Sequence, residues 1–296
     1  MLAKVLAYLT CAIIWGTTWR AIRVCIAPGQ WDPYTALVLR FALASLLLLP
    51  FALRAQVRPS RKQWWVLIGA GVLDAMAYTL VYLGEQSVTG GVAAVIYGTQ
   101  PFVLAGFMGL TRHEKIGQRD LVGAAIALGG VALLFAGQLQ LGAAQALGVV
   151  LVFGSVVCST IYSALVKRHA SEVPASFATT VFLSVTALSL VPLALLKGRG
   201  HWLVSAWQPW VALTYLAVAG SVIAFLLYFW LLARVSMRTI SALVFLFPLI
   251  ALAVDFVAEP GQHFGWRDLG GAAIVLAGLA VALTGPRRQS VVSAEA

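Results

Sequence analysis

Residues 119–137 read RDLVGAAIALGGVALLFAG, and residues 267–285 read RDLGGAAIVLAGLAVALTG. The two stretches are identical at eleven of nineteen positions, including the leading Arg-Asp-Leu and three glycines. Such a match within one chain indicates an internal duplication. Both stretches are almost entirely apolar after their first two residues, so the fold depends on which environment can accommodate long apolar segments.

The composition places these segments in a lipid bilayer. Hydrophobic residues make up 61% of the 296 positions and charged residues 10%, whereas an average soluble protein has about 25% charged residues. A helix needs roughly 20 apolar residues to cross the hydrocarbon, whereas a transmembrane β-strand alternates over about ten. The runs are long and apolar on all sides, so the sequence predicts an all-α integral membrane protein. Ten transmembrane helices are predicted, at residues 4–26, 33–53, 64–85, 89–110, 119–136, 145–166, 174–195, 208–232, 236–257 and 266–284.

The duplication extends upstream of the quoted stretches. Residues 88–101 (VTGGVAAVIYGTQP) align with residues 235–248 (VSMRTISALVFLFP), so Pro101 and Pro248 occupy equivalent points. Because each half has an odd number of crossings, the second half is expected to be inverted relative to the first. The predicted organisation is a five-helix repeat at 1–137, an inverted five-helix repeat at 142–285 and a short cytoplasmic tail at 286–296.

Membrane topology, rather than a nucleic-acid partner, explains the net charge of +10. With the N-terminus in the cytoplasm, fourteen of the twenty Lys and Arg residues lie on the cytoplasmic side, five lie opposite, and Arg40 lies inside a helix. This asymmetry follows the positive-inside rule and predicts that both termini are cytoplasmic. The first apolar segment resembles a signal peptide, but it lacks an A-x-A-like cleavage site, so we expect it to be retained.

Three signatures resemble a known family. They are IIWGTTW at 13–19, ALVLRFALASLLLLP at 36–50, and the duplicated stretch that closes each half. In this order they resemble the EamA-type transporters of the drug/metabolite transporter superfamily. The resemblance implies ten helices in an inverted repeat around a central cavity, no cofactor, and secondary transport across the bacterial inner membrane. The family includes amino-acid exporters, and one branch exports aromatic amino acids.

The third predicted helix carries a polar face. Asp74, Tyr78, Tyr82 and Glu85 are spaced i, i+4, i+8 and i+11, which places them on one side of a helix. Asp74 lies near the helix centre, where a charge costs about 2.5 to 3.5 kcal/mol on insertion scales. We therefore predict an ion pair between Asp74 and Arg40. That pair either only holds two helices together, or Asp74 also couples protons or meets the amine of a substrate.

Deep aromatic and polar side chains on other helices predict an aromatic cavity for an amphipathic small molecule. Tryptophans near helix ends are instead typical of lipid interfaces, namely Trp64, Trp65, Trp202, Trp207, Trp210 and Trp266. An aromatic cavity suits amino acids, nucleobases or cationic drugs alike, so a multidrug or nucleobase-type exporter remains an alternative. The predicted substrate-binding residues are Trp15, Trp19, Asp74, Tyr78, Tyr82, Tyr97, Gln100, Ser159, Tyr162, Phe225 and Tyr228.

The remaining features concern packing and mechanism. Glycines and alanines in the duplicated helices predict close helix packing, either at a homodimer seam or at the periphery. Pro101 and Pro248 each kink a helix and are either hinges or tolerated bends. The predicted partners are therefore a small-molecule substrate, membrane lipid and a possible second copy of the chain.

An intramembrane enzyme is the rival class, and the motifs argue against it. HEKIG at 113–117 is not H-E-x-x-H, there is no G-x-S-x-G, and the four histidines are expected in loops. The three cysteines form no motif, so neither a metal site nor a disulfide is predicted. No P-loop is present, so ATP is not the direct driver. We predict a secondary transporter that works by alternating access and exports amino acids or related metabolites.

Overall fold

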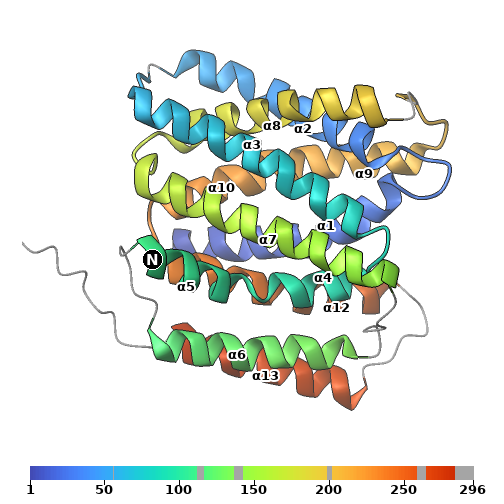
Figure 1. The fold of residues 1–296 in the computed structure, drawn as a ribbon, viewed down its shortest axis with the longest axis vertical. Helices are drawn as coiled ribbons and strands as arrows, with labels where there is room; N and C mark the ends of the chain where they lie inside the picture. Colours follow the sequence, from blue (N-terminus) through green and yellow to red (C-terminus); the bar gives the residue numbers. More distant parts are fainter. Residues whose placement is uncertain (56, 112–116, 137–142, 199–201, 259–264, 284–296) are drawn as a thin grey trace, which may run out of the picture.

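A computed structural model describes residues 1–55, 57–111, 117–136, 143–198, 202–258 and 265–283. Within these ranges every regular element is helical, and no strand is present, so the predicted all-α class is confirmed for the described residues. The elements, drawn in Figure 1, are α1 (Leu2–Cys25), α2 (Pro33–Arg54), α3 (Arg61–Gly84), α4 (Gly90–Tyr97), α5 (Gln100–Thr111), α6 (Gln118–Leu134), α7 (Ala143–His169), α8 (Ala175–Lys197), α9 (Trp207–Ala217), the π-helix η2 (Val218–Ile223), α10 (Ala224–Leu232), α11 (Met237–Ser241), the 3₁₀-helix η3 (Ala242–Phe245), α12 (Leu246–Ala258) and α13 (Trp266–Leu283).

All ten predicted segments fall on helices, and three of them are interrupted. Among the described residues, seven helical stretches are long and apolar enough to cross a membrane, and two shorter apolar helices cover Val92–Met108 and Leu269–Ala282. Ten crossings therefore stay a prediction. The six tryptophans assigned to lipid interfaces are all exposed.

Two of the interruptions precede the equivalent prolines. The fourth segment breaks between α4 and α5 at Gly98 and Thr99, just before Pro101. The ninth segment narrows into η3 just before Pro248. A proline has no N–H for the carbonyl one turn earlier, so the backbone tightens or breaks there. Their role as hinges remains a prediction.

Helix starts are specified locally. The Asp32 side chain accepts hydrogen bonds from the backbone N–H groups of Tyr34 and Thr35, and Pro33 occupies the first turn of α2. Ser60 and Gln63 form a capping box at the start of α3. These contacts satisfy N–H groups that have no partner within the helix.

Helices α6 and α13 lie side by side at one end of the molecule (Figure 1). A Cβ atom placed on Gly278 would lie 2.6 Å from the carbonyl oxygen of Gly123, and one on Gly130 would lie 2.7 Å from that of Gly271. The backbones therefore touch, as small residues allow in lipid. The small-residue faces of α6 and α13 therefore pack against each other within one chain, at the periphery of the molecule. A homodimer stays a prediction.

Candidate functional site

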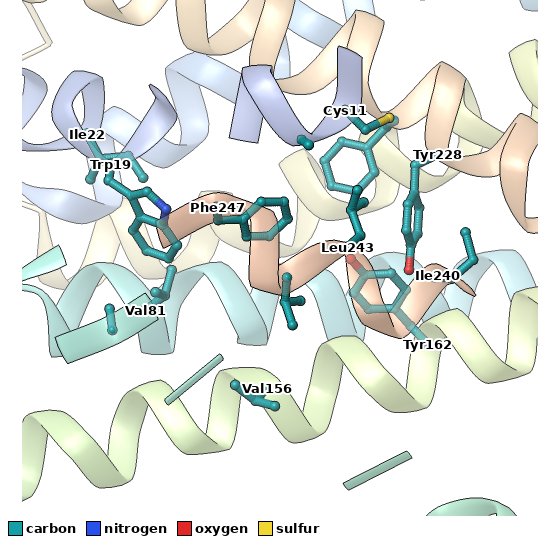
Figure 2. Packing of buried hydrophobic residues seen from close by; sticks show 14 of the residues in the cluster. Cys11, Trp19, Ile22, Val81, Val156, Tyr162, Tyr228, Ile240, Leu243 and Phe247 are labelled. Atoms are coloured by element: carbon teal, nitrogen blue, oxygen red, sulfur yellow. The ribbon is translucent and has the colours of Figure 1, made fainter. Parts of the chain in front are cut away.

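A cavity of about 100 Å³ lies among α1, α3, α4, the start of α5, α7, α10 and the run from α11 to α12. This volume is room for several water molecules or a small solute. In the view of Figure 2, Leu243 and Phe247 lie between Trp19 on one side and Tyr162 and Tyr228 on the other. The lining residues come from both halves of the chain, and their side chains are mostly aromatic, aliphatic and hydroxyl-bearing, with one carboxylate, Asp74, and one amide, Gln100.

Ten of the eleven predicted substrate-binding residues line this cavity. The exception is Tyr82, which is fully buried beside Arg40. The role of the other ten residues in substrate binding stays a prediction. The ten are Trp15, Trp19, Asp74, Tyr78, Tyr97, Gln100, Ser159, Tyr162, Phe225 and Tyr228.

Arg40 is buried and connects three elements. Its Nε donates to the Oγ atom of Ser221 at 2.9 Å, and its Nη1 donates to the hydroxyl of Tyr82 at 3.3 Å. Its Nη2 donates to the hydroxyl of Tyr78 and to the carbonyl oxygen of Gly220, both at 3.4 Å. The guanidinium also lies 4.7 Å from the centre of the Tyr78 ring. Arg40 therefore ties α2 to α3 and to η2, and it does not line the cavity.

The predicted ion pair between Arg40 and Asp74 is wrong as a direct contact. Asp74 accepts a hydrogen bond from the Thr186 hydroxyl at 3.1 Å through Oδ2, and its Oδ1 is buried without a partner. The four bonds of Arg40 go to neutral groups, two of them on η2. The prediction considered only the second and third helices, whereas α8 and η2 supply the nearest partners.

The π-helix η2 is a structural feature that the sequence analysis missed. A π-turn widens the helix and loosens its regular i→i−4 ladder, which leaves carbonyl groups able to accept other donors. The carbonyl oxygen of Gly220 accepts from Trp15 Nε1 at 3.2 Å in addition to Arg40. The available signal was the Gly-Ser pair at 220–221 within an otherwise apolar run.

Aromatic rings form much of the cavity wall. Trp15 makes edge contacts with Phe225, Tyr228 and Phe247, with ring centres 5.5, 5.1 and 6.0 Å away. Trp19 packs on Tyr97 with ring centres 5.7 Å apart. Edge contacts of this kind stabilise aromatic pairs beyond simple burial, so the walls are held in place before any ligand enters.

Hydroxyl pairs fix the polar part of the wall. Tyr97 and Ser155 are joined at 2.7 Å, and so are Ser163 and Tyr228. Ser163, Thr186 and Ser221 were not predicted as site residues. Isolated Ser and Thr residues in apolar helices often bond only to their own backbone, as Ser159 does to Val156. The sequence therefore does not distinguish them from Ser and Thr residues that bond to another helix.

Two further predictions concern residues outside the cavity. Glu85 follows α3 and does not line the cavity, although both of its carboxylate oxygens are buried without a partner. His169 is the last residue of α7, so its assignment to a loop was wrong. The other three histidines, His113, His201 and His263, lie outside the described residues.

Comparison with known proteins gives consistent matches along the chain. The EamA-like transporter family profile matches residues 2–136 and again residues 146–284. The inner membrane transporter YedA of Escherichia coli, itself uncharacterised, is 27% identical over 264 residues, covering 87% of this chain and 84% of YedA. An uncharacterised transporter of Archaeoglobus fulgidus is 24% identical over 274 residues, covering 90% of this chain and 92% of the relative. A solved crystal structure superposes with a TM-score of 0.79 at 19% identity, covering 97% of this chain and 99% of that one, which shows the shared fold.

Proposed function

Because the chain belongs to the EamA-like transporter family, we propose that it is a secondary transporter that carries a small molecule through the central cavity by alternating access. The observation that carries the proposal is the cavity itself, which helices from both halves enclose and hydroxyl and aromatic groups line. Sites of this kind at the interface of two repeats allow the halves to rock around a bound substrate.

The inverted repeat is part of this proposal, with the halves at 1–137 and 142–285. Gly123 and Gly271 are equivalent in sequence, as are Gly130 and Gly278. Across the α6–α13 pair, Gly123 faces Gly278 and Gly130 faces Gly271. This exchange of partners is what a two-fold relation between the halves requires, so it supports the repeat. The basic-residue asymmetry supports cytoplasmic termini, and the printed name of the E. coli relative supports the inner membrane.

Amino acids, aromatic or neutral, are the substrates that the sequence resemblance favours, with drugs and nucleobase-like metabolites as alternatives. The aromatic and hydroxyl-bearing walls support an amphipathic solute. Export is the proposed direction of transport, and transport is either coupled to protons or downhill.

Uptake into proteoliposomes tests the transport function. We expect saturable uptake of a labelled amino acid or amine, and a change of that uptake under an imposed pH gradient if protons are coupled. Ser159 lines the cavity and bonds only within its own helix, so Ser159→Phe should fill the cavity and reduce uptake at least about tenfold. Ala125→Phe, on an exposed position of α6, is the control. Normal uptake by a folded Ser159→Phe protein would exclude the cavity as the route.

The Arg238–Asp120 ion pair is expected to close one end of the transporter. It joins α11 to α6 at 3.0 Å, with one residue from each half. At the same end Lys167 donates to the carbonyl oxygens of Leu232 and Val235, both at 2.7 Å. These contacts support closure on the predicted cytoplasmic side.

Arg238→Gln should therefore speed maleimide labelling of a Ser241→Cys reporter, which lines a small hollow beside the pair. The expected increase is about 1.5- to 5-fold, because a partly exposed ion pair contributes only about 0.2–1 kcal/mol. Arg234→Gln removes the same charge four residues earlier, in the turn between α10 and α11, where its guanidinium donates to the carbonyl oxygen of Trp230. Equal labelling rates in both variants would rule out a closing role for the pair.

A further inference from the structure

The cavity wall contains two buried polar atoms that have no hydrogen-bond partner. They are Oδ1 of Asp74 and Nε1 of Trp19, an acceptor and a donor. Among the described residues, the other unpartnered buried side-chain atoms belong to Tyr8, Gln30 and Glu85, which do not line the cavity. Buried polar groups without partners are costly and rare, so each one at a cavity surface indicates a group that a ligand supplies.

The charged group on the cavity wall is Asp74, whereas the guanidinium of Arg40 does not line the cavity and lies against the Tyr78 ring. Asp74 is the only charged residue among the described residues that line the cavity. Four of the five N–H donors of Arg40 are directed to Ser221, Gly220 and the two tyrosines. A ligand carboxylate would lose its hydration in this cavity without gaining a cationic partner, whereas a ligand ammonium would meet a free carboxylate oxygen.

The two unpartnered atoms belong to different parts of the cavity wall. Trp19 packs on Tyr97 of α4, whereas Asp74 accepts a hydrogen bond from Thr186 of α8. The Trp15, Tyr78 and Phe247 side chains line the cavity with them. A complementary ligand therefore has its donor and its acceptor at opposite ends of an apolar body.

We propose that the cavity selects amphipathic amines of net positive charge. The ammonium group of the ligand donates to Oδ1 of Asp74, a neutral oxygen of the ligand accepts from Nε1 of Trp19, and the apolar body packs against the aromatic walls. The proposal rests on the proposed transport function and narrows its substrate class from amphipathic solutes in general to cations.

Four probes that differ by single groups test this directly. Tyramine has the ammonium and the oxygen at opposite ends of one ring, 2-phenylethylamine lacks the oxygen, tyrosine adds a carboxylate, and 3-(4-hydroxyphenyl)propionate lacks the amine. Calorimetric titration of the purified protein in lipid nanodiscs should give affinities in that order, with no binding of the propionate. This comparison uses the unaltered protein, so it does not depend on whether any variant folds.

Variants then assign the contacts. Asp74→Asn keeps an acceptor for Thr186 and should weaken tyramine at least about tenfold, which is the usual effect of losing a charge-assisted hydrogen bond. Trp19→Phe keeps the ring contact with Tyr97 and should lower the affinity for tyramine to that for 2-phenylethylamine, whose own affinity should not change. Glu85→Gln removes the other buried carboxylate of the same helix face and should leave both affinities unchanged.

The outcomes separate this proposal from the transport function. Tyrosine binding as tightly as tyramine, or an unchanged tyramine affinity in Asp74→Asn, would overturn selection for cations while leaving a transporter with this cavity. If no probe binds and none is taken up by proteoliposomes, both the selection for amines and the cavity as a substrate site for such molecules are wrong.

Discussion

Gly278→Val is expected to separate α6 from α13 and to remove most of the folded protein from the membrane. Any side chain at Gly278 meets backbone atoms of Ala127 and the carbonyl oxygen of Gly123, which cannot rotate away as a flexible side chain would. The helices would have to move apart along much of their contact, because Gly130 and Gly271 make the same kind of contact further along the pair. We expect a loss of at least about 3 kcal/mol in the free energy of unfolding.

The measurement is the thermal midpoint of the detergent-solubilised protein, together with its level in the membrane. Gly129→Ala and Gly270→Ala are matched controls in the same two helices, because nothing lies within 4 Å of a Cβ atom at either position. Both controls should be neutral or stabilising by up to about 1 kcal/mol, as alanine favours the helix over glycine. A Gly278→Val midpoint within the range of the controls would mean that the pair tolerates separation.

The helical segments were predictable because crossing the hydrocarbon requires a long apolar run. The second segment was predicted at 33–53 and is observed as Pro33–Arg54, since Asp32 and Pro33 are local start signals. The interruption at Ala242–Phe245 was only partly predictable, because Pro248 indicates a kink without giving its form. The π-helix η2 contains no proline and interacts with Arg40 and Trp15 from other helices, so its sequence alone carries little signal.

The candidate site was predictable as a set of faces but not as a set of contacts. Helical periodicity placed Asp74 and Tyr78 on one side of α3, and both line the cavity. Periodicity says nothing about which helix packs opposite, so Thr186 of α8 and Ser221 of η2 were not identified as partners. Tyr82 shares the predicted face, yet it points to Arg40 rather than into the cavity.

Arg40→Met is expected to destabilise the protein by about 2–4 kcal/mol and to abolish uptake. The change removes four hydrogen bonds and leaves Tyr82 and Ser221, both fully buried, without their donor. It also releases Tyr78, which lines the cavity, and η2, which supports the cavity wall. Arg40→Lys should recover only part of the loss, because an ammonium group cannot reach acceptors spread around a planar guanidinium. Arg54→Met, at the exposed end of the same helix, should change neither the stability nor the uptake.

The double variant Arg40→Met/Asp74→Asn distinguishes a purely geometric role of Arg40 from an electrostatic one. Arg40 and Asp74 make no direct contact, and Tyr78, one turn from Asp74, bonds to the guanidinium. If Arg40 also balances the buried carboxylate, neutralising Asp74 should restore about 1 kcal/mol relative to Arg40→Met alone. The thermal midpoints of the four proteins in the cycle measure this coupling. Strict additivity would limit the role of Arg40 to its hydrogen bonds, and the charge of Asp74 would then be accommodated in the cavity without help from Arg40.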